Sequence, residues 1–268
     1  MNILILGDIM GLSGRQAVKK NLSKIISKNQ IDFTIINGEN SADDGKGITK
    51  LIANEFFLLG VDVITSGNHI WDKQETTDFI NQENRLLRPA NLVEGSPGNG
   101  YGIYSTKNKK FKVGVINLMG NVFMRKTEDV FKTACKIKEK MILKKNVDFI
   151  IIDFHGEITS EKMAIGHFFD GLSTGVVGTH THVPTADTRI LEKGTAYQTD
   201  IGMCGDYNSV IGMNKENSLK RFLKDKNAVN HFPSEGEGTL SGIIIEADPD
   251  SGLAKKITRL VEGGVFNK

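Results

Sequence analysis

The sequence predicts a layered α/β fold, and three observations lead to that prediction. Seven short runs rich in apolar and β-branched residues recur along the 268-residue chain, and each has the length of a buried strand. Stretches with helical spacing of apolar residues lie between most of the first six runs. The part from about residue 187 onward contains more strand than helix, which suggests a second sheet packed on the first.

The expected strands, in chain order, are NILIL (2–6), DFTIING (32–38), VDVITSG (61–67), KVGVINL (112–118), VDFIIIDF (147–154), GVVGT (175–179) and GIIIEA (242–247). Helices are expected over about 14–28, 48–59, 73–83, 130–145, 159–169 and 215–226. Ser13 is the expected N-cap of the first helix, because a serine oxygen accepts from the free amides of a first turn. KNKKFK (107–112) is interpreted as a solvated hairpin turn.

The composition is that of an ordinary globular protein. Hydrophobic residues make up 39% and charged residues 25% of the chain, and 34 basic against 32 acidic residues give a net charge of +2. This balance gives no strong signal for nucleic-acid binding. No apolar run approaches the ~20 residues of a membrane span, and the N-terminus lacks the basic start of a signal peptide. We expect a cytoplasmic protein with one domain over residues 1–268, and its two cysteines fit a reducing compartment.

Polar side chains follow five of the expected strands. The set consists of Asp8, Glu39, Asn40, Asn68, His69, His155, His180 and His182. His180 and His182 are one residue apart after a buried strand, so they are expected to project together. Because ligands of open α/β sheets bind beyond the carboxyl ends of strands, we expect these groups to meet at one edge.

Each of these residues alone also has an ordinary explanation. Asp8, Asn40 and Asn68 are typical turn formers, His69 is a suitable cap for a helix near Trp71, and His155 is compatible with a buried core histidine. The combination at one edge favours a metal site. The glycine-rich segments do not match a dinucleotide or P-loop fingerprint, since the glycines at 7, 11 and 14 have the wrong spacing.

Carboxylate, amide and imidazole groups without thiolate suit Mn, Fe, Ni or Zn better than Ca or Mg. This number of groups is too large for one tetrahedral ion and about right for two ions that share a ligand. Glu39 is the natural bridge, because its carboxylate has two oxygens. Two divalent ions against two carboxylates leave a positive site that attracts a phosphate.

These residues resemble the motifs of the calcineurin-like metallophosphoesterase superfamily. The matching segments are Gly7–Met10, Gly38–Asn40, Gly67–His69, His155 and Gly178–His182, over about residues 1–185. Met10 replaces the usual histidine ligand and Glu39 the usual bridging aspartate. These changes, with Asn40, resemble a bacterial branch of 2′,3′-cyclic-nucleotide phosphodiesterases, as do RPAN (88–91), NLMG (117–120) and TDIGMCG (199–205). Asp206 stands where that branch has a proline.

The resemblance implies a four-layer α/β/β/α sandwich of two mixed sheets flanked by helices. It implies that a first ion is held by Asp8, Glu39, Asn40 and His182, and a second by Glu39, Asn68, His155 and His180. Iron or manganese is expected, with zinc or nickel as alternatives. His69 is left without a metal and is the expected acid for the leaving oxygen.

The resemblance therefore implies a di-metal phosphodiesterase that hydrolyses cyclic nucleotides of the 2′,3′-cyclic AMP type to nucleoside monophosphates through a metal-bridging hydroxide. The alternatives are another phosphoesterase (a phosphomonoesterase, nuclease or 5′-nucleotidase) and a nucleotide-sensing regulator without catalysis. The expected partner is a small cyclic nucleotide or other phosphodiester, with no membrane. Self-association into a homo-oligomer is suggested by the resemblance alone.

Overall fold

The structure, a computed structural model, describes residues 1–267 and contains two six-stranded sheets packed face to face. Its strands are β1 (Asn2–Ile9), β2 (Phe33–Asn37), β3 (Val63–Thr65), β4 (Tyr101–Ser105), β5 (Lys112–Met119), β6 (Phe149–His155), β7 (Gly175–Thr179), β8 (Arg189–Ile190), β9 (Ala196–Gln198), β10 (Met203–Cys204), β11 (Leu240–Ala247) and β12 (Ala254–Glu262). Its helices are α1 (Gly11–Lys28), α2 (Lys50–Leu58), α3 (Gln74–Phe79), α4 (Val130–Lys140), α5 (Thr159–Phe168), α6 (Lys215–Phe222) and the 3₁₀ turn η1 (Gly264–Asn267).

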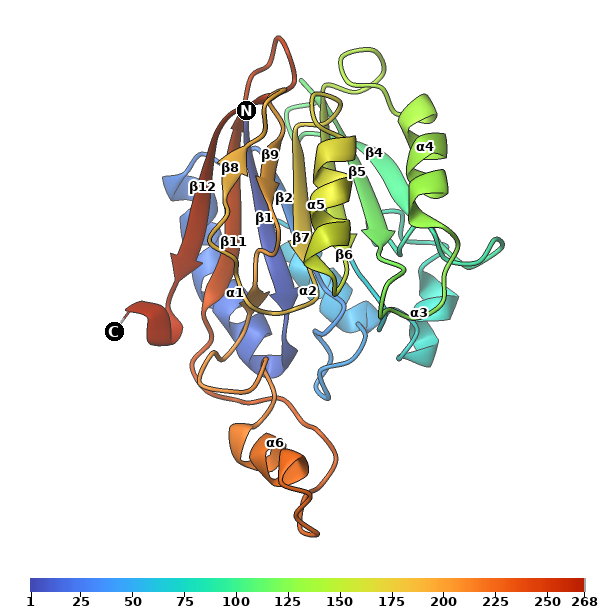
Figure 1. Cartoon of the computed structure of the whole chain (residues 1–268). Coiled ribbons are helices and arrows are strands. Elements are labelled where there is room, and N and C mark those ends of the chain that lie inside the picture. The colour runs from blue at the N-terminus through green and yellow to red at the C-terminus, as the bar shows by residue number, and fades with distance from the viewer. Residues whose placement is uncertain (268) are drawn as a thin grey trace.

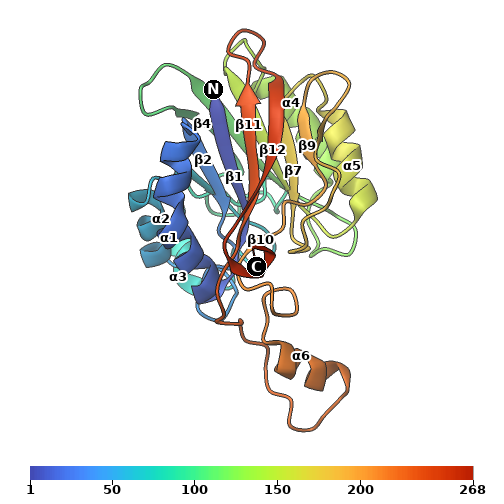
Figure 2. The ribbon, with the colours of Figure 1, turned by 90° about the vertical axis from the view of Figure 1, so that its left-hand side faces the viewer.

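Both sheets have a parallel centre; the first has antiparallel strands at its β12 edge only, and the second at both edges. The first has the order β12-β11-β1-β2-β3, with β10 paired to β1, and the second has the order β4-β5-β6-β7-β9-β8. Strands β1, β2 and β3 run parallel, as do β5, β6 and β7. The helices α1, α2 and α3 cover one outer face and α4 and α5 cover the other (Figure 2). The predicted four-layer α/β/β/α class is therefore confirmed.

Strand alternation divides the apolar residues between three cores. In β1, Ile3 and Ile5 pack between the sheets, whereas Leu4 and Leu6 pack against the helices of the first sheet. In β6, Ile151 likewise belongs to the core between the sheets, while the neighbouring residues on each side face α4 and α5. This two-sided burial explains why these strands appear in the sequence as continuous apolar runs.

The predicted segments match the structure with several corrections. Helices α3 and α6 end at Phe79 and Phe222, four residues before the predicted ends at 83 and 226. Helix α1 begins at Gly11 rather than 14, and Ser13 is not its N-cap, because the Ser13 hydroxyl donates to Gly236 O at 2.8 Å instead. Helix α4 ends at Lys140 rather than 145, where Met141 becomes extended and buries its side chain. The chain after residue 187 does not form a separate second sheet. Its strands complete both sheets, and the second sheet begins at β4.

The lysine-rich turn is confirmed, since residues 106–111 join the antiparallel strands β4 and β5. Within residues 1–267 no helix has the length and apolar character needed to cross a membrane.

A segment over residues 206–237, here called the arm, projects beyond the carboxyl end of β1 and carries α6 (Figure 1). Phe222 and Leu223 in the arm are 77% and 79% exposed. The base of the arm reaches the strand ends, because His182 Nδ1 donates to the carbonyl oxygen of Ile211 at 2.7 Å. The arm therefore contributes to the surroundings of the predicted site.

Candidate metal centre

The predicted ligands come from both sheets and lie together at the carboxyl ends of the strands. Asp8, Glu39, Asn40, Asn68 and His69 lie at or after β1, β2 and β3, whereas His155, His180 and His182 lie at or after β6 and β7. We call Asn68, His155 and His180 the His155 cluster, and Asp8, Asn40 and His182 the His182 cluster. Glu39 contacts the His155 cluster through its carboxylate and precedes Asn40 of the His182 cluster in the chain.

The His155 cluster is assembled around one ring nitrogen. His155 Nε2 lies 2.9 Å from Glu39 Oε1, 3.1 Å from Asn68 Oδ1 and 3.1 Å from His180 Nδ1. Glu39, His155 and His180 each offer a ligand atom, and these atoms all lie within 4.8 Å of one another. Such a group of nitrogen and oxygen atoms is suited to a transition-metal ion.

The other nitrogen of His155 is held by a hydrogen-bond chain. The Thr179 hydroxyl lies 3.0 Å from His155 Nδ1 and donates to Asp153 Oδ1 at 2.7 Å. Because that hydroxyl gives its proton to Asp153, it accepts from His155 Nδ1–H, and Nε2 is left to face the ligand atoms. A metal-ligating histidine is oriented in the same way, through its second nitrogen.

The charges of the His155 cluster favour a cation. Burial alone would lower the pKa of His155, but the carboxylates of Glu39, Asp8 and Asp153 outweigh it and raise that pKa to about 9. Burial would likewise raise the pKa of Glu39, yet His155 lowers it to about 2. The pKa of His180 falls to about 3, because it is buried beside His155. The protein therefore stabilises one positive charge at the point where these atoms meet.

The His182 cluster has the same chemistry with looser contacts. His182 Nδ1 donates to Ile211 O, so Nε2 faces Asn40 Oδ1 at 3.3 Å. Asn40 Nδ2 donates to Gly45 O at 2.8 Å, which fixes the direction of its oxygen. Both atoms are hydrogen-bond acceptors, so neither can donate to the other, and a positive ion can be bound by both.

One buried oxygen of Asp8 lacks a hydrogen bond. Asp8 Oδ2 accepts from His180 N at 3.1 Å, whereas among residues 1–267 Oδ1 has no hydrogen-bond partner and lies 3.6 Å from His155 Nδ1. Burial raises the pKa of Asp8 to about 6, although His182 and His155 act in the opposite direction. An orphaned carboxylate oxygen inside a protein costs free energy, and a bound cation would satisfy it. The chemistry of these donor atoms therefore fits a bound cation.

Gly67 makes room for the ligands. A Cβ atom at this position would lie 2.2 Å from His155 Cδ2 and 2.4 Å from Glu39 Oε2, closer than real contacts allow. The glycine of the GNH motif is thus required because two ligand side chains occupy the space of its missing side chain.

His69 stands at the edge of the site and is 24% exposed. Its backbone N–H donates to Glu39 Oε2 at 3.0 Å, and its Nδ1 lies 2.7 Å from Asp72 Oδ2. Asp72 also pairs with Arg125 at 3.3 Å. Asp72 was not predicted, although its spacing of three residues after His69 is visible in the sequence.

Three other expectations concern residues outside the ligand set. Met10 does not face the clusters, since it packs where Cβ atoms of Gly45 and Gly212 would lie, within 2.8 Å of its side chain. In RPAN, Asn91 ties its loop to β5 by accepting from Met119 N and donating to Met119 O. The two cysteines, Cys135 and Cys204, are free.

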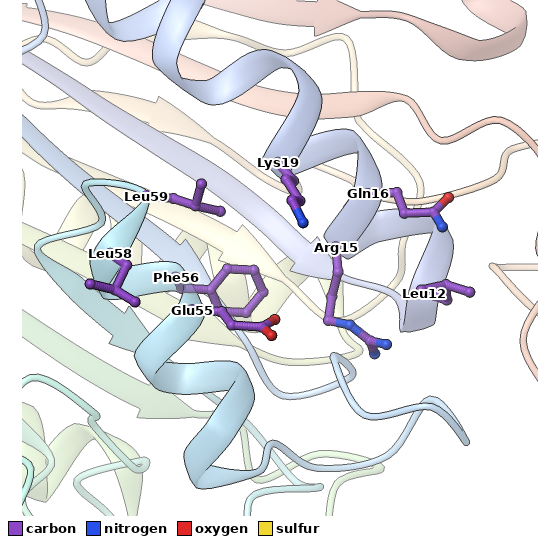
Figure 3. Close-up of a pocket in the computed structure, with 8 residues that line it drawn as sticks. All are labelled: Leu12, Arg15, Gln16, Lys19, Glu55, Phe56, Leu58 and Leu59. Carbon is purple, nitrogen blue, oxygen red and sulfur yellow. The ribbon is translucent and has the colours of Figure 1, made fainter.

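A separate cavity of about 470 Å³ lies between α1 and α2 (Figure 3). Its lining consists of Leu12, Arg15, Gln16, Lys19, Glu55, Phe56, Leu58 and Leu59 and includes none of the predicted ligands. Arg15 extends from it to donate to Ser41 O and the Asp43 carboxylate, on the loop that follows Glu39. The cavity is therefore separate from the predicted site.

Comparison with known proteins adds a family and several relatives. A family model described as YmdB-like protein matches residues 4–260. The chain is 46% identical over 261 residues to the 2′,3′-cyclic-nucleotide 2′-phosphodiesterase of Bacillus subtilis (strain 168), covering 97% of each protein. The crystal structure of a novel phosphatase from Mycoplasma pneumoniae is 37% identical, with a TM-score of 0.88 over 98% of this chain and 94% of that chain.

A more distant structure shares the fold. The 5′-nucleotidase from Candida albicans SC5314 superimposes with a TM-score of 0.58 at 16% identity, over 97% of this chain and 51% of that chain.

Proposed function

The chain belongs to the YmdB-like protein family, and on that basis we propose that it is a di-metal phosphodiesterase that hydrolyses 2′,3′-cyclic nucleotides to nucleoside monophosphates. The observation that carries this proposal is the convergence of Glu39 Oε1, Asn68 Oδ1 and His180 Nδ1 on His155 Nε2. Asp8 adds a buried oxygen that has no hydrogen-bond partner among residues 1–267. The identity to the Bacillus subtilis 2′,3′-cyclic-nucleotide 2′-phosphodiesterase supports this activity, as does the resemblance of the motifs to those of calcineurin-like metallophosphoesterases.

We assign one ion to the His182 cluster and one to the His155 cluster, with Glu39 shared. With Glu39 counted, each proposed ion has one or two imidazoles, one amide oxygen and at least one carboxylate, a donor set that suits iron or manganese. Bound ions at these positions would activate a water and neutralise charge that develops on the phosphoryl oxygens. Because only Asp8 and Glu39 are anionic among the ligands, the loaded site remains positive and attracts the phosphodiester anion.

His69 then serves as the general acid. Attack by water forms a new phosphorus–oxygen bond, the bond from phosphorus to one ribose oxygen breaks, and that oxygen needs a proton. Asp72 holds Nδ1 of His69, so Nε2 is the nitrogen that delivers the proton. The partial exposure of His69 allows a substrate to reach it.

A direct test incubates the metal-loaded protein with 2′,3′-cyclic AMP and separates the products by chromatography. The double variant Asn68→Ala/His69→Ala removes one ligand and the acid. His167→Ala is the matched control, because His167 is exposed on α5. We expect turnover by the wild type and the control only. Equal turnover by the double variant would exclude the proposed site.

Phosphomonoesterase activity is the second candidate, favoured by the name of the Mycoplasma pneumoniae structure. Rates on bis-p-nitrophenyl phosphate and p-nitrophenyl phosphate distinguish the two. A diesterase hydrolyses the first faster, whereas a monoesterase prefers the second. A faster rate on the monoester would indicate that the same metal site serves a phosphomonoesterase.

A further inference from the structure

A buried ion pair lies next to the loop that carries the two histidines after β7. Lys162 Nζ, from α5, donates to Asp200 Oδ2 at 2.6 Å, and both side chains are only 1% exposed. Each of the other lysine or arginine ion pairs within residues 1–267 includes a side chain that is at least 32% exposed. Because desolvation offsets much of the attraction in a buried pair, stability alone is a weak explanation for it.

The pair is bonded to the backbone on both sides of His180. Lys162 Nζ also donates to Thr179 O at 2.8 Å. Asp200 Oδ2 accepts from Thr181 N at 3.1 Å and from Thr181 Oγ1 at 2.8 Å. Asp200 Oδ1 accepts from Gly202 N at 2.8 Å. Four hydrogen bonds thus connect the pair to residues 179–181 and to the segment that holds Asp200.

The held segment has an unfavourable backbone. His180 has φ of 102° and His182 has φ of 65°, both in the left-handed region that side chains other than glycine rarely adopt. Such conformations persist only where the surroundings impose them. Thr181 lies between the two histidines and is the residue that Asp200 binds twice.

The approach of Asp200 to β7 requires Gly178. A Cβ atom on Gly178 would lie 1.8 Å from Thr199 O and 3.0 Å from Lys162 Cδ. Residues 199–202 therefore run directly against the end of β7, and Ile201 N donates to Gly178 O at 2.9 Å. This contact places Asp200 next to the loop that carries the two histidines. It gives a structural role to residues 199–202 of the TDIGMCG segment.

We propose that Lys162 and Asp200 are positioning residues that hold His180 and His182 in the geometry needed to bind metal. The pair fixes Thr179 and Thr181, the residues on either side of His180, so that the two rings reach different ions although only Thr181 separates them. This inference rests on the proposed function, because it assumes that both histidines are ligands.

The test measures Mn²⁺ binding by equilibrium dialysis for the wild type, Lys162→Met and Asp200→Asn. Removal of a residue that orients a ligand typically weakens metal binding by about 10- to 100-fold, and we expect a loss in that range for both variants. Thr181→Val is a milder variant, because it removes only one donor to Asp200. It is expected to weaken Mn²⁺ binding by less than Lys162→Met or Asp200→Asn does. Thr181→Ser keeps the hydroxyl and is expected to bind as the wild type does.

A second measurement needs no metal. Hydrogen exchange of the peptide over residues 178–183 in the metal-free protein should become faster in Lys162→Met and Asp200→Asn, because the Thr181 amide loses its anchored acceptor. Asp170→Asn is the matched structural control. Asp170 is also buried, but its carboxylate accepts from Lys193 N and Thr195 N, on a turn that contains none of the predicted ligands.

The outcomes separate the two proposals. If the wild type binds no Mn²⁺, the proposed function fails and the positioning role fails with it. If the wild type binds two ions, and the Lys162 and Asp200 variants melt lower but bind Mn²⁺ as well as Asp170→Asn does, only the positioning role is overturned. Weaker binding with faster exchange in residues 178–183, absent from Asp170→Asn, supports it.

Discussion

The His155 cluster and the His182 cluster contain similar ligands but differ in how closely those ligands lie. Around His155 Nε2, three ligand atoms lie within 3.1 Å. In the His182 cluster the corresponding contact to Asn40 is 3.3 Å, and Asp8 Oδ1 has no hydrogen-bond partner in the described part of the chain. The first cluster is therefore already assembled, whereas the second is more open.

The difference follows from the segment on which each histidine lies. His155 is the last residue of β6 and pairs in register with Thr179 of β7, so the sheet itself sets its position. His182 lies in a loop after β7, and the acceptor of its Nδ1–H belongs to the base of the arm. The ends of central strands therefore fix the positions of the ligands that they carry. The position of a ligand on a loop depends instead on the segments that pack against that loop.

The largest expected effect comes from Glu39, the residue that the proposal assigns to both ions. Glu39→Ala should abolish binding of both ions and reduce hydrolysis of 2′,3′-cyclic AMP by roughly 10⁴-fold, because each ion stabilises the transition state by several kcal/mol and 1.36 kcal/mol corresponds to tenfold. Metal analysis and initial rates measure the effect. Retention of two ions per chain would contradict the shared role.

The two clusters should respond differently when each loses its histidine. His155→Ala is expected to reduce the rate by about 10³-fold and to remove the tighter class of Mn²⁺ sites, and His182→Ala to reduce it by about 10²-fold and remove the weaker class. A Mn²⁺ titration followed by electron paramagnetic resonance measures both classes. If His182→Ala removed the tighter class instead, the order of the clusters would be reversed.

His69 should affect the chemistry without affecting either cluster. His69→Gln is expected to lower the rate on 2′,3′-cyclic AMP by about 10²-fold while two ions remain bound. The loss should be much smaller on bis-p-nitrophenyl phosphate, since p-nitrophenolate leaves without a proton. An equal loss on both substrates would argue against a general acid.

Asp72 should have the smallest effect of the four. Asp72→Asn is expected to lower the rate by about tenfold, because His69 remains present but loses the acceptor that orients it. The comparison of steady-state rates for this variant and His69→Gln measures how much of the effect depends on orientation. A loss as large as that of His69→Gln would give Asp72 a larger role than orientation.

Much of the fold could be predicted, because buried parallel strands leave a clear signal in the sequence. All seven expected strands form, and the groups that follow them meet at one edge, as parallel strands require. The unpredicted strands are short or lie at sheet edges. Half of β12 is exposed and carries charged residues, so its sequence does not resemble a buried run.

The supporting residues could not be predicted in this way. Asp153 lies inside an apolar run, and nothing in its neighbours indicates that Thr179 connects it to His155. Lys162 resembles any lysine on an amphipathic helix until the position of Asp200 is known. Such contacts depend on the packing of segments distant in sequence, which periodicity does not report.

Both clusters combine side chains from the two sheets, since Asp8, Asn40 and Asn68 belong to the first and the three histidines to the second. An ion bound there would act as a cross-link that exists only while the layers are together. At a free ion concentration of about 100 times the dissociation constant, one such ion would add about 2.7 kcal/mol to the free energy of unfolding. The folded fraction of this chain would then vary with the supply of trace metal in its surroundings.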